Sequence, residues 1–246
     1  MFYLSRLWLV TMTVAVTTAA AAAQGASVSL HVSVVQSPGH NAEQHGAMPK
    51  VNEADPVIVW LVRLGPPDAS VHRPEAAAQN FTLTQKNKQF SPHLLVIPTG
   101  ASVDFPNLDP YFHNVFSLFN GRRFDLGLYE AGGRRSVRFD HDGVSYIFCN
   151  IHPEMGAVIV SLSTPWHSTS KPDGSVVLRN IPPGDYELNL WSQNVSPGDS
   201  LAARQRVHVG TQDIKLAPVV FTSRTVPIDH LNKFGEPYRK SDHTLY

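Results

Sequence analysis

The chain has 246 residues and a formal net charge of zero, and 42 % of its residues are hydrophobic. This length allows one large domain or two small ones, with ample apolar side chains for a core. Basic residues are scattered along the chain and balanced by acidic ones, which argues against nucleic acid or an anionic membrane surface as a partner.

The N-terminus has the pattern of a targeting segment. Arg6 supplies a positive charge, residues 7–16 form an apolar run, and small residues follow up to Ala23 and Gln24. The run is short for a membrane span, and the small residues are typical of a cleavage site. We therefore expect residues 1–23 to be a secretory signal cleaved near Ala23, which predicts a periplasmic or secreted protein without a membrane span. An uncleaved membrane anchor is the alternative.

Short strand-like runs separated by loops follow along the chain. Residues 27–35 alternate apolar with small or polar side chains, and residues 57–62 are a continuous apolar run. Further strands are expected at residues 81–85, 90–98 and 101–105, whereas residues 37–55, 65–79 and 120–130 have the composition of loops. No run has helical periodicity over more than a turn or two, so we expect an all-β chain.

The second half continues in the same way. Residues 134–148 are predicted to form a hairpin that turns at Asp142 and Gly143, with its second arm ending at Cys149. Residues 157–162 form the next strand, and residues 164–172 a linker. A strand, a Pro-Pro-Gly turn and a second strand follow, and two more strands are expected at residues 205–209 and 214–221.

Four side chains have the chemistry of a metal site. Cys149 is the only cysteine, His152 and Met155 follow it at short intervals, and His113 lies upstream. A thiolate, two imidazoles and a thioether are a ligand set that copper prefers. An exported protein with an unpaired thiol also needs protection from oxidation, which metal ligation provides. Each residue alone is more often structural; together they predict a mononuclear copper site.

Residues 81–162 resemble the cupredoxin family. The similarity lies in the Val-Asp-Phe-Pro-Asn run before His113 and in the C-x-x-H-x-x-M spacing after it, which is that of amicyanin. Residues 112–117 and 148–155 also resemble the cupredoxin-like proteins named for methylamine utilisation. The resemblance implies a Greek-key β-sandwich with one type 1 copper ion. It implies His113, Cys149 and His152 as equatorial ligands and Met155 as the weak axial ligand.

The same resemblance implies roles for residues around the ligands. Asn114 would steady the thiolate loop by hydrogen bonds, Pro153 would stiffen it, and Phe148 and Phe112 would keep water out. The imidazole of His152 would touch the surface and act as the electron port. An apolar rim for docking would consist of Pro110, Tyr111, Pro153 and Gly156.

The flanking sequence resembles a different sandwich, the carboxypeptidase-regulatory-like domain of the Cna-B or transthyretin type. Its turn-and-strand signature matches residues 173–186. We therefore expect a second, smaller transthyretin-like β-sandwich built from residues 27–66 and 165–222. The cupredoxin domain, residues 80–163, would be inserted between these two parts, and residues 223–246 would form a C-terminal extension.

The leading functional hypothesis is an exported blue copper protein that carries single electrons to a transient redox protein partner. We expect no enzyme, because the chain lacks the His-x-His pairs of multicopper oxidases and the second cysteine of a binuclear copper centre. The alternatives are a copper carrier or buffer without electron transfer, and a module that binds carbohydrate or protein.

Overall fold

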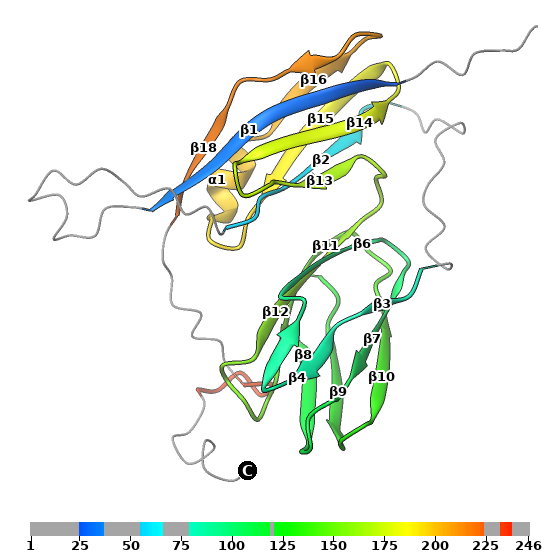
Figure 1. The fold of residues 1–246 in the computed structure, drawn as a ribbon, viewed down its shortest axis with the longest axis vertical. Helices are drawn as coiled ribbons and strands as arrows, with labels where there is room; N and C mark the ends of the chain where they lie inside the picture. Colours follow the sequence, from blue (N-terminus) through cyan, green and yellow to red (C-terminus); the bar gives the residue numbers. More distant parts are fainter. Residues whose placement is uncertain (1–24, 37–54, 66–78, 119–120, 224–231, 238–246) are drawn as a thin grey trace, which may run out of the picture.

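The computed structural model describes residues 25–36, 55–65, 79–118, 121–223 and 232–237. The fold is all-β, and its strands form two β-sandwiches, an upper and a lower one in the view of Figure 1. The expected signal segment and its cleavage site at Ala23 and Gln24 lie outside the described residues.

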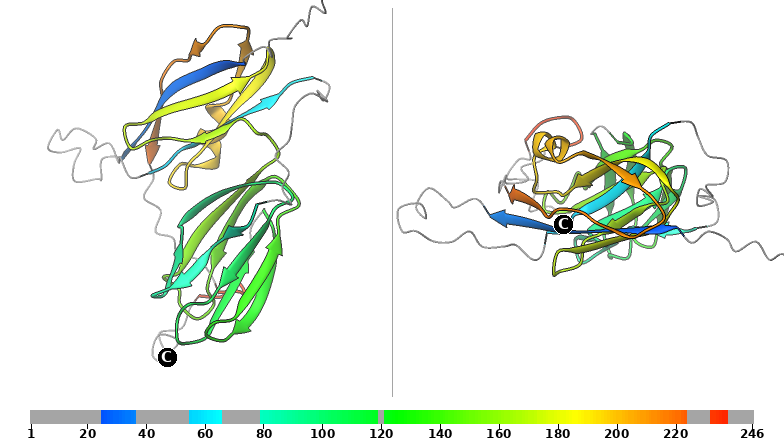
Figure 2. Two further views of the ribbon diagram at one scale, coloured as in Figure 1. Left: turned by 45° about the vertical axis from the view of Figure 1, so that its right-hand side comes forward. Right: turned by 90° about the horizontal axis from the view of Figure 1, so that it is seen from above.

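The upper sandwich joins strands from both ends of the chain. In its first sheet, β1 (Ala26–Gln36) pairs antiparallel with β14 (Ser175–Ile181) and parallel with β17 (Ile214–Lys215) and β18 (Val219–Ser223). The second sheet has the order β13 (His167–Thr169), β2 (Ile58–Arg63), β15 (Gly184–Trp191) and β16 (Gln205–Val209). Alternate residues of β1 face the core between the sheets, as its apolar alternation predicts. Figure 2 shows the two layers from further directions.

The lower sandwich consists of the strands between residues 81 and 162. One sheet has the order β6 (Leu94–Pro98), β12 (Gly156–Leu162), β11 (Gly143–Phe148), β8 (His113–Ser117) and β9 (Phe124–Tyr129). The facing sheet has the order β10 (Arg134–Arg138), β7 (Ser102–Pro106) and β3 (Phe81–Thr82). A two-stranded hairpin, β4 (Thr84–Lys86) with β5 (Gln89–Ser91), lies beside them.

The predicted hairpin over residues 134–148 is wrong. β10 pairs with β7, whereas β11 pairs with β12 and β8 in the opposite sheet. The segment with Asp142 and Gly143 is therefore a crossing between sheets. The Asp142 carboxylate accepts hydrogen bonds from the hydroxyls of Thr99 and Ser163 there, which anchors the crossing to neighbouring chain segments.

Two segments expected to be irregular are strands. Within residues 120–130, β9 pairs with β8, and the pairing shifts register between Asn114 and Phe116. Gly127, at a φ of +68°, lies within β9 where this register shifts, which explains why the alternation of the strand is weak in the sequence. In the expected linker, β13 pairs with β2. The expected strand at residues 214–221 is divided into β17 and β18.

The two sandwiches meet through the outer faces of β2 and β12. In β2, Val59 and Leu61 face the core of the upper sandwich, whereas Ile58 packs against the lower one. In β12, Ile159 faces the lower core and Val160 faces outward to Ile58 and its neighbours. Each strand has apolar residues on both sides, so each reads as a continuous apolar run instead of an alternating one.

Helical structure is confined to α1 (Pro197–Ala202) among the described residues. Ser196 caps this helix by accepting a hydrogen bond from the Asp199 N–H at 3.1 Å. Over the described part of the chain, no helix has the length and apolar character that crossing a membrane requires.

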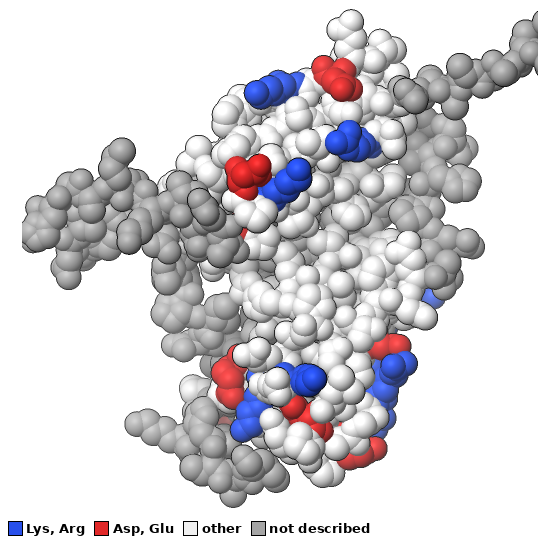
Figure 3. All heavy atoms as spheres, in the orientation of Figure 1, with Lys and Arg blue, Asp and Glu red and all other residues white. Residues whose placement is uncertain are grey.

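On the face in Figure 3, basic and acidic side chains are mixed and gather towards the two ends of the molecule.

Candidate metal centre

Three potential ligands converge in the lower sandwich. His113 is the first residue of β8, and Cys149 follows the last residue of β11. These strands are neighbours, since Phe148 pairs with Phe116. His152 lies in the loop that leads from Cys149 to β12. The sheet order therefore brings together two residues that are 36 positions apart in the sequence.

The donor atoms form a small triangle. Cys149 Sγ lies 3.7 Å from Nδ1 of His113 and 3.7 Å from Nδ1 of His152, and the two nitrogens are 3.1 Å apart. A point equidistant from the corners of such a triangle lies about 2.0 Å from each, close to the ~2.0–2.1 Å of metal–nitrogen and ~2.3 Å of metal–sulfur bonds. Within the described ranges, this is the one group of three or more His, Cys, Asp or Glu residues close enough to share an ion.

Asp109 orients the ring of His113. Its Oδ2 lies 2.8 Å from Nε2 of His113, and both side chains are buried. Burial tends to raise the pKa of Asp109, but hydrogen bonds from the Lys88 backbone, His113 and the Asn87 backbone lower it below its ordinary value. A carboxylate only accepts hydrogen bonds, so the neutral ring is protonated on Nε2 and its Nδ1 lone pair faces Cys149. Carboxylate–histidine pairs of this kind commonly support metal ligands.

The turn between β4 and β5 holds Asp109 in place. The Asn87 N–H donates to Oδ1 at 2.6 Å, and the Lys88 N–H donates to Oδ2 at 3.0 Å. Both turn residues have positive φ angles, 55° and 56°. A lysine in the left-handed region is strained, and the hydrogen bonds to the carboxylate offset that strain. Asn107 Oδ1 also accepts the Asp109 N–H at 3.0 Å, which fixes the backbone.

The two imidazoles are close neighbours in a buried place. Burial lowers the pKa of His152 to about 4, and the nearby His113 adds to this shift. Burial also lowers the pKa of His113, although Asp109 opposes the change. Both rings are therefore neutral near pH 7. Because two lone pairs at 3.1 Å repel, a proton on His152 or a shared cation must lie between the two Nδ1 atoms.

The surroundings of the sulfur suit a buried thiolate. Burial raises the pKa of the Cys149 thiol, while the backbone N–H groups of Asn114, Ile151 and His152 act in the opposite direction. The metal-free thiol is thus protonated at neutral pH, and a metal would displace its proton. The three N–H groups are then placed to stabilise the negative sulfur. The residues present therefore fit a copper ion, for which thiolate and imidazole are preferred ligands.

The other predicted site residues lie next to this cluster. Met155 is buried in the same apolar core as Cys149, and its N–H donates to the His152 carbonyl at 3.0 Å. Phe148 is buried, with 3 % of its surface exposed, and Pro153 is half-buried at the edge of a surface cleft of about 370 Å³.

Asn114 contributes to the cluster through its backbone. Its N–H faces the Cys149 sulfur, whereas its side-chain Nδ2 donates to Asp125 Oδ1 of β9 at 2.7 Å. The Asn114 backbone therefore contacts the thiolate, whereas its side chain bonds to β9 and not to the thiolate loop.

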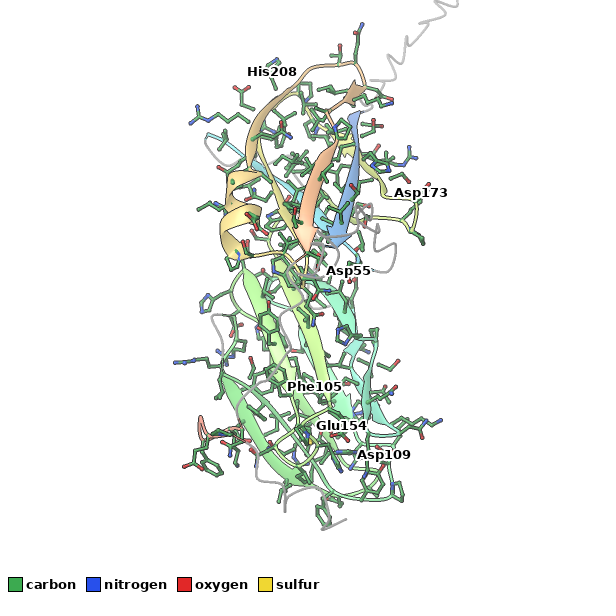
Figure 4. The ribbon with its side chains drawn as sticks, turned by 90° about the vertical axis from the view of Figure 1, so that its left-hand side faces the viewer. Asp55, Phe105, Asp109, Glu154, Asp173 and His208 are labelled. Carbon is green, nitrogen blue, oxygen red and sulfur yellow. The ribbon has the colours of Figure 1, made fainter. Side chains whose placement is uncertain are left out.

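Tyr111 covers both imidazoles, with its ring centroid 5.3 Å from that of His113 and 5.7 Å from that of His152. Only 6 % of His152 is exposed, so the imidazole that is expected to touch the surface is almost entirely covered. Phe112, which is expected to keep water out of the site, is 51 % exposed. Figure 4 shows Asp109 and Glu154 in the part of the lower sandwich that is farther from the upper one.

Sequence reasoning missed Asp109, Asp125 and the covering role of Tyr111. The sequence does contain an indication for Asp109. Ligand histidines are commonly hydrogen-bonded to a carboxylate, and Asp109 lies only four residues before His113. The contact between Asp125 and Asn114 depends on the register of β8 and β9, and no local pattern indicates it.

No protein-family model matches the chain, and no curated protein does. Solved structures match parts of it. A copper-containing nitrite reductase from Thermus scotoductus SA-01 is 24 % identical over 35 % of this chain, with a TM-score of 0.34. The match covers 23 % of that reductase chain, so this chain corresponds to less than a quarter of its length.

Two smaller copper proteins match a similar share of this chain. A purple cupredoxin from Nitrosopumilus maritimus is 24 % identical over 33 % of this chain and 99 % of its own, with a TM-score of 0.31. A copper(I) form of an amicyanin variant is 18 % identical over 36 % of this chain and 87 % of its own, with a TM-score of 0.33. Each likeness is confined to about a third of this chain.

Proposed function

We propose that this chain is an exported type 1 copper protein that carries single electrons between redox partners. The observation that carries the proposal is the buried triangle of Cys149 Sγ and the Nδ1 atoms of His113 and His152, whose size fits one metal ion. Met155, buried in the same core, is the proposed weak axial ligand. Copper bound there would accept and release one electron by alternating between Cu(II) and Cu(I).

The protein contributes a rigid set of metal-donor atoms in a buried site. His113 is held by Asp109, which is itself held by backbone N–H groups of the β4–β5 turn. The Cys149 loop is fixed between β11 and β12. A rigid three-donor set limits the change in geometry between the two oxidation states, which favours rapid electron transfer.

The proposed route for the electron passes the covered edge of His152. Tyr111 and Pro153 are half-buried near this edge, Pro110 is exposed, and Gly156 lies at the start of β12. A small rim of this kind suits a transient redox protein partner, since weak electron-transfer encounters use interfaces below about 1,200 Å².

The arrangement of the chain supports a further part of the proposal. We propose that residues 80–163 are a cupredoxin domain inserted into a transthyretin-like sandwich made of residues 27–66 and 165–222. The support is strand pairing across the insertion: β1 pairs with β14, and β2 pairs with β15.

The decisive experiment loads the purified protein with Cu(II) and records its visible spectrum and voltammogram. We expect an intense blue band and a reversible one-electron couple, and both should disappear in Cys149→Ser. Tight Cu(I) binding without colour or a couple would instead support a copper carrier or buffer. A blue band that survives Cys149→Ser would refute the ligand assignment.

A further inference from the structure

A short turn near the C-terminus lies against the loop that holds Cys149. Residues 232–237 form this turn beside the lower sandwich, drawn in red in Figures 1 and 2. Asn232 closes it, because its Oδ1 accepts the N–H groups of Phe234 at 2.9 Å and Glu236 at 3.0 Å. Gly235 has a φ of +79°, which favours glycine. The turn is thus held by its own hydrogen bonds.

Lys233 joins this turn to two parts of the lower sandwich. Its backbone N–H donates to Asn150 Oδ1 at 2.9 Å, and Asn150 directly follows Cys149. Its Nζ lies 2.9 Å from Asp125 Oδ2 of β9. The lysine side chain is 25 % exposed, so its ammonium group is partly shielded from solvent. One residue of the C-terminal turn therefore contacts both the thiolate loop and the edge strand.

Asp125 continues these contacts towards the sulfur. While Oδ2 faces Lys233, Oδ1 accepts hydrogen bonds from Asn114 Nδ2 at 2.7 Å and the Gly127 N–H at 2.9 Å. The backbone N–H of Asn114 is one of the three that face Cys149. Two chains of contacts thus connect the lysine to the surroundings of the sulfur, one through Asn150 and one through Asp125 and Asn114.

We propose that Lys233 is a positioning residue: the C-terminal turn clamps the Cys149 loop, and the Lys233 ammonium group neutralises Asp125, whose other oxygen holds Asn114 beside the sulfur. The effect of Lys233 on the reduction potential of bound copper rests on the proposed function, whereas its effect on the Cys149 loop does not. Removing the charge should lower the reduction potential of bound copper. A nearby cation and a firmly held N–H donor both favour the reduced, less positive state.

The conformational part is tested on the metal-free, full-length protein by hydrogen exchange. In Lys233→Met, the amides of residues 149–152 should exchange about two- to fivefold faster, as expected for the loss of a half-exposed ion pair. Lys233→Arg should restore the slow exchange. Lys215→Met, which removes an exposed lysine of β17 in the upper sandwich, is the matched control and should change nothing.

Asp125→Asn should speed the exchange as much as Lys233→Met, and the double variant should add little, because both break the same contact. Unchanged exchange in Lys233→Met would overturn the proposal.

After copper loading, Lys233→Met should shift the reduction potential downward, with recovery in Lys233→Arg. A potential equal to that of the unaltered protein would overturn the electrostatic part. A missing blue couple in the unaltered protein would refute the proposed function, and the exchange data would still decide the role of the turn.

Discussion

The ring of His113 is held by one carboxylate, so we expect the site to respond strongly to a change at Asp109. Both oxygens of Asp109 accept hydrogen bonds, from Asn87, Lys88 and His113. In Asp109→Asn, an NH2 donor replaces one of these oxygens, so the amide cannot accept all three hydrogen bonds. We expect copper affinity to fall about 10–100-fold, the usual effect of losing such a support. Competition with a chelator of known affinity measures this.

A second His–Asp pair provides the control. His208 Nδ1 and Asp185 Oδ1 are also 2.8 Å apart, but their side chains are 78 % and 69 % exposed on the upper sandwich. Asp185→Asn should leave copper affinity unchanged. Equal losses in both variants would show that Asp109 has no special role at the site.

The two buried imidazoles also predict how the metal-free protein responds to acid. Burial and the neighbouring ring lower the pKa of His152 to about 4 in the folded state, whereas an unfolded histidine titrates near ~6.5. Between these values the unfolded chain binds more protons, so the free energy of unfolding falls as pH decreases from about 6.5 to about 4. Urea unfolding at several pH values measures the slope, which should be shallower in His152→Gln. Equal slopes would contradict this account.

Among the strands, local sequence was a good guide where one face or both faces are buried. The alternation of β1 and the continuous apolar runs of β2 and β12 predicted these strands, because each pattern reports directly which faces meet a core. The same patterns were sufficient for the all-β fold class. They do not determine which strand pairs with which, so the crossing between β10 and β11 was mistaken for a hairpin.

For the candidate site, the sequence predicted the potential ligands but not the residues that surround them. His113, Cys149 and His152 have side chains whose types and spacing point to a metal, and the structure brings these three together. Tyr111 and Asp125 act through packing and strand register, which depend on contacts between distant segments. Lys233 is the clearest case, since it contacts Asp125 from 108 positions away in the sequence.

In the molecule as a whole, the two sandwiches share a buried apolar cluster. Ile58 of the upper sandwich is fully buried there with Val158 and Val160 of the lower one. His93 adds a polar link, because its ring nitrogens lie 3.0 Å from the Gly156 carbonyl and 2.8 Å from Gln193 Oε1. The metal loop is thus connected to the upper sandwich as well as to its own core.

This shared cluster predicts a stability effect. Ile58→Ala should lower the free energy of unfolding by about 2–5 kcal/mol, because it leaves a cavity between the sandwiches. Val62→Ala in the same strand is the control, since Val62 is 41 % exposed, and it should change stability by under about 1 kcal/mol. Denaturant unfolding measures both. A small effect of Ile58→Ala would mean that the contact between the sandwiches contributes little.

The pairing of β2 with β15 has a consequence for biosynthesis. Arg63 and Pro183, joined by a hydrogen bond, are 120 positions apart, so the ribosome makes one long before the other. At ~5–20 residues per second the delay is about 6–24 s. Until β13 and β15 have been made, β2, apolar on both faces, has no partner strand, and prior compaction of residues 81–162 shortens the free segment that must close. We therefore expect the central portion of a nascent chain to fold before the upper sandwich closes.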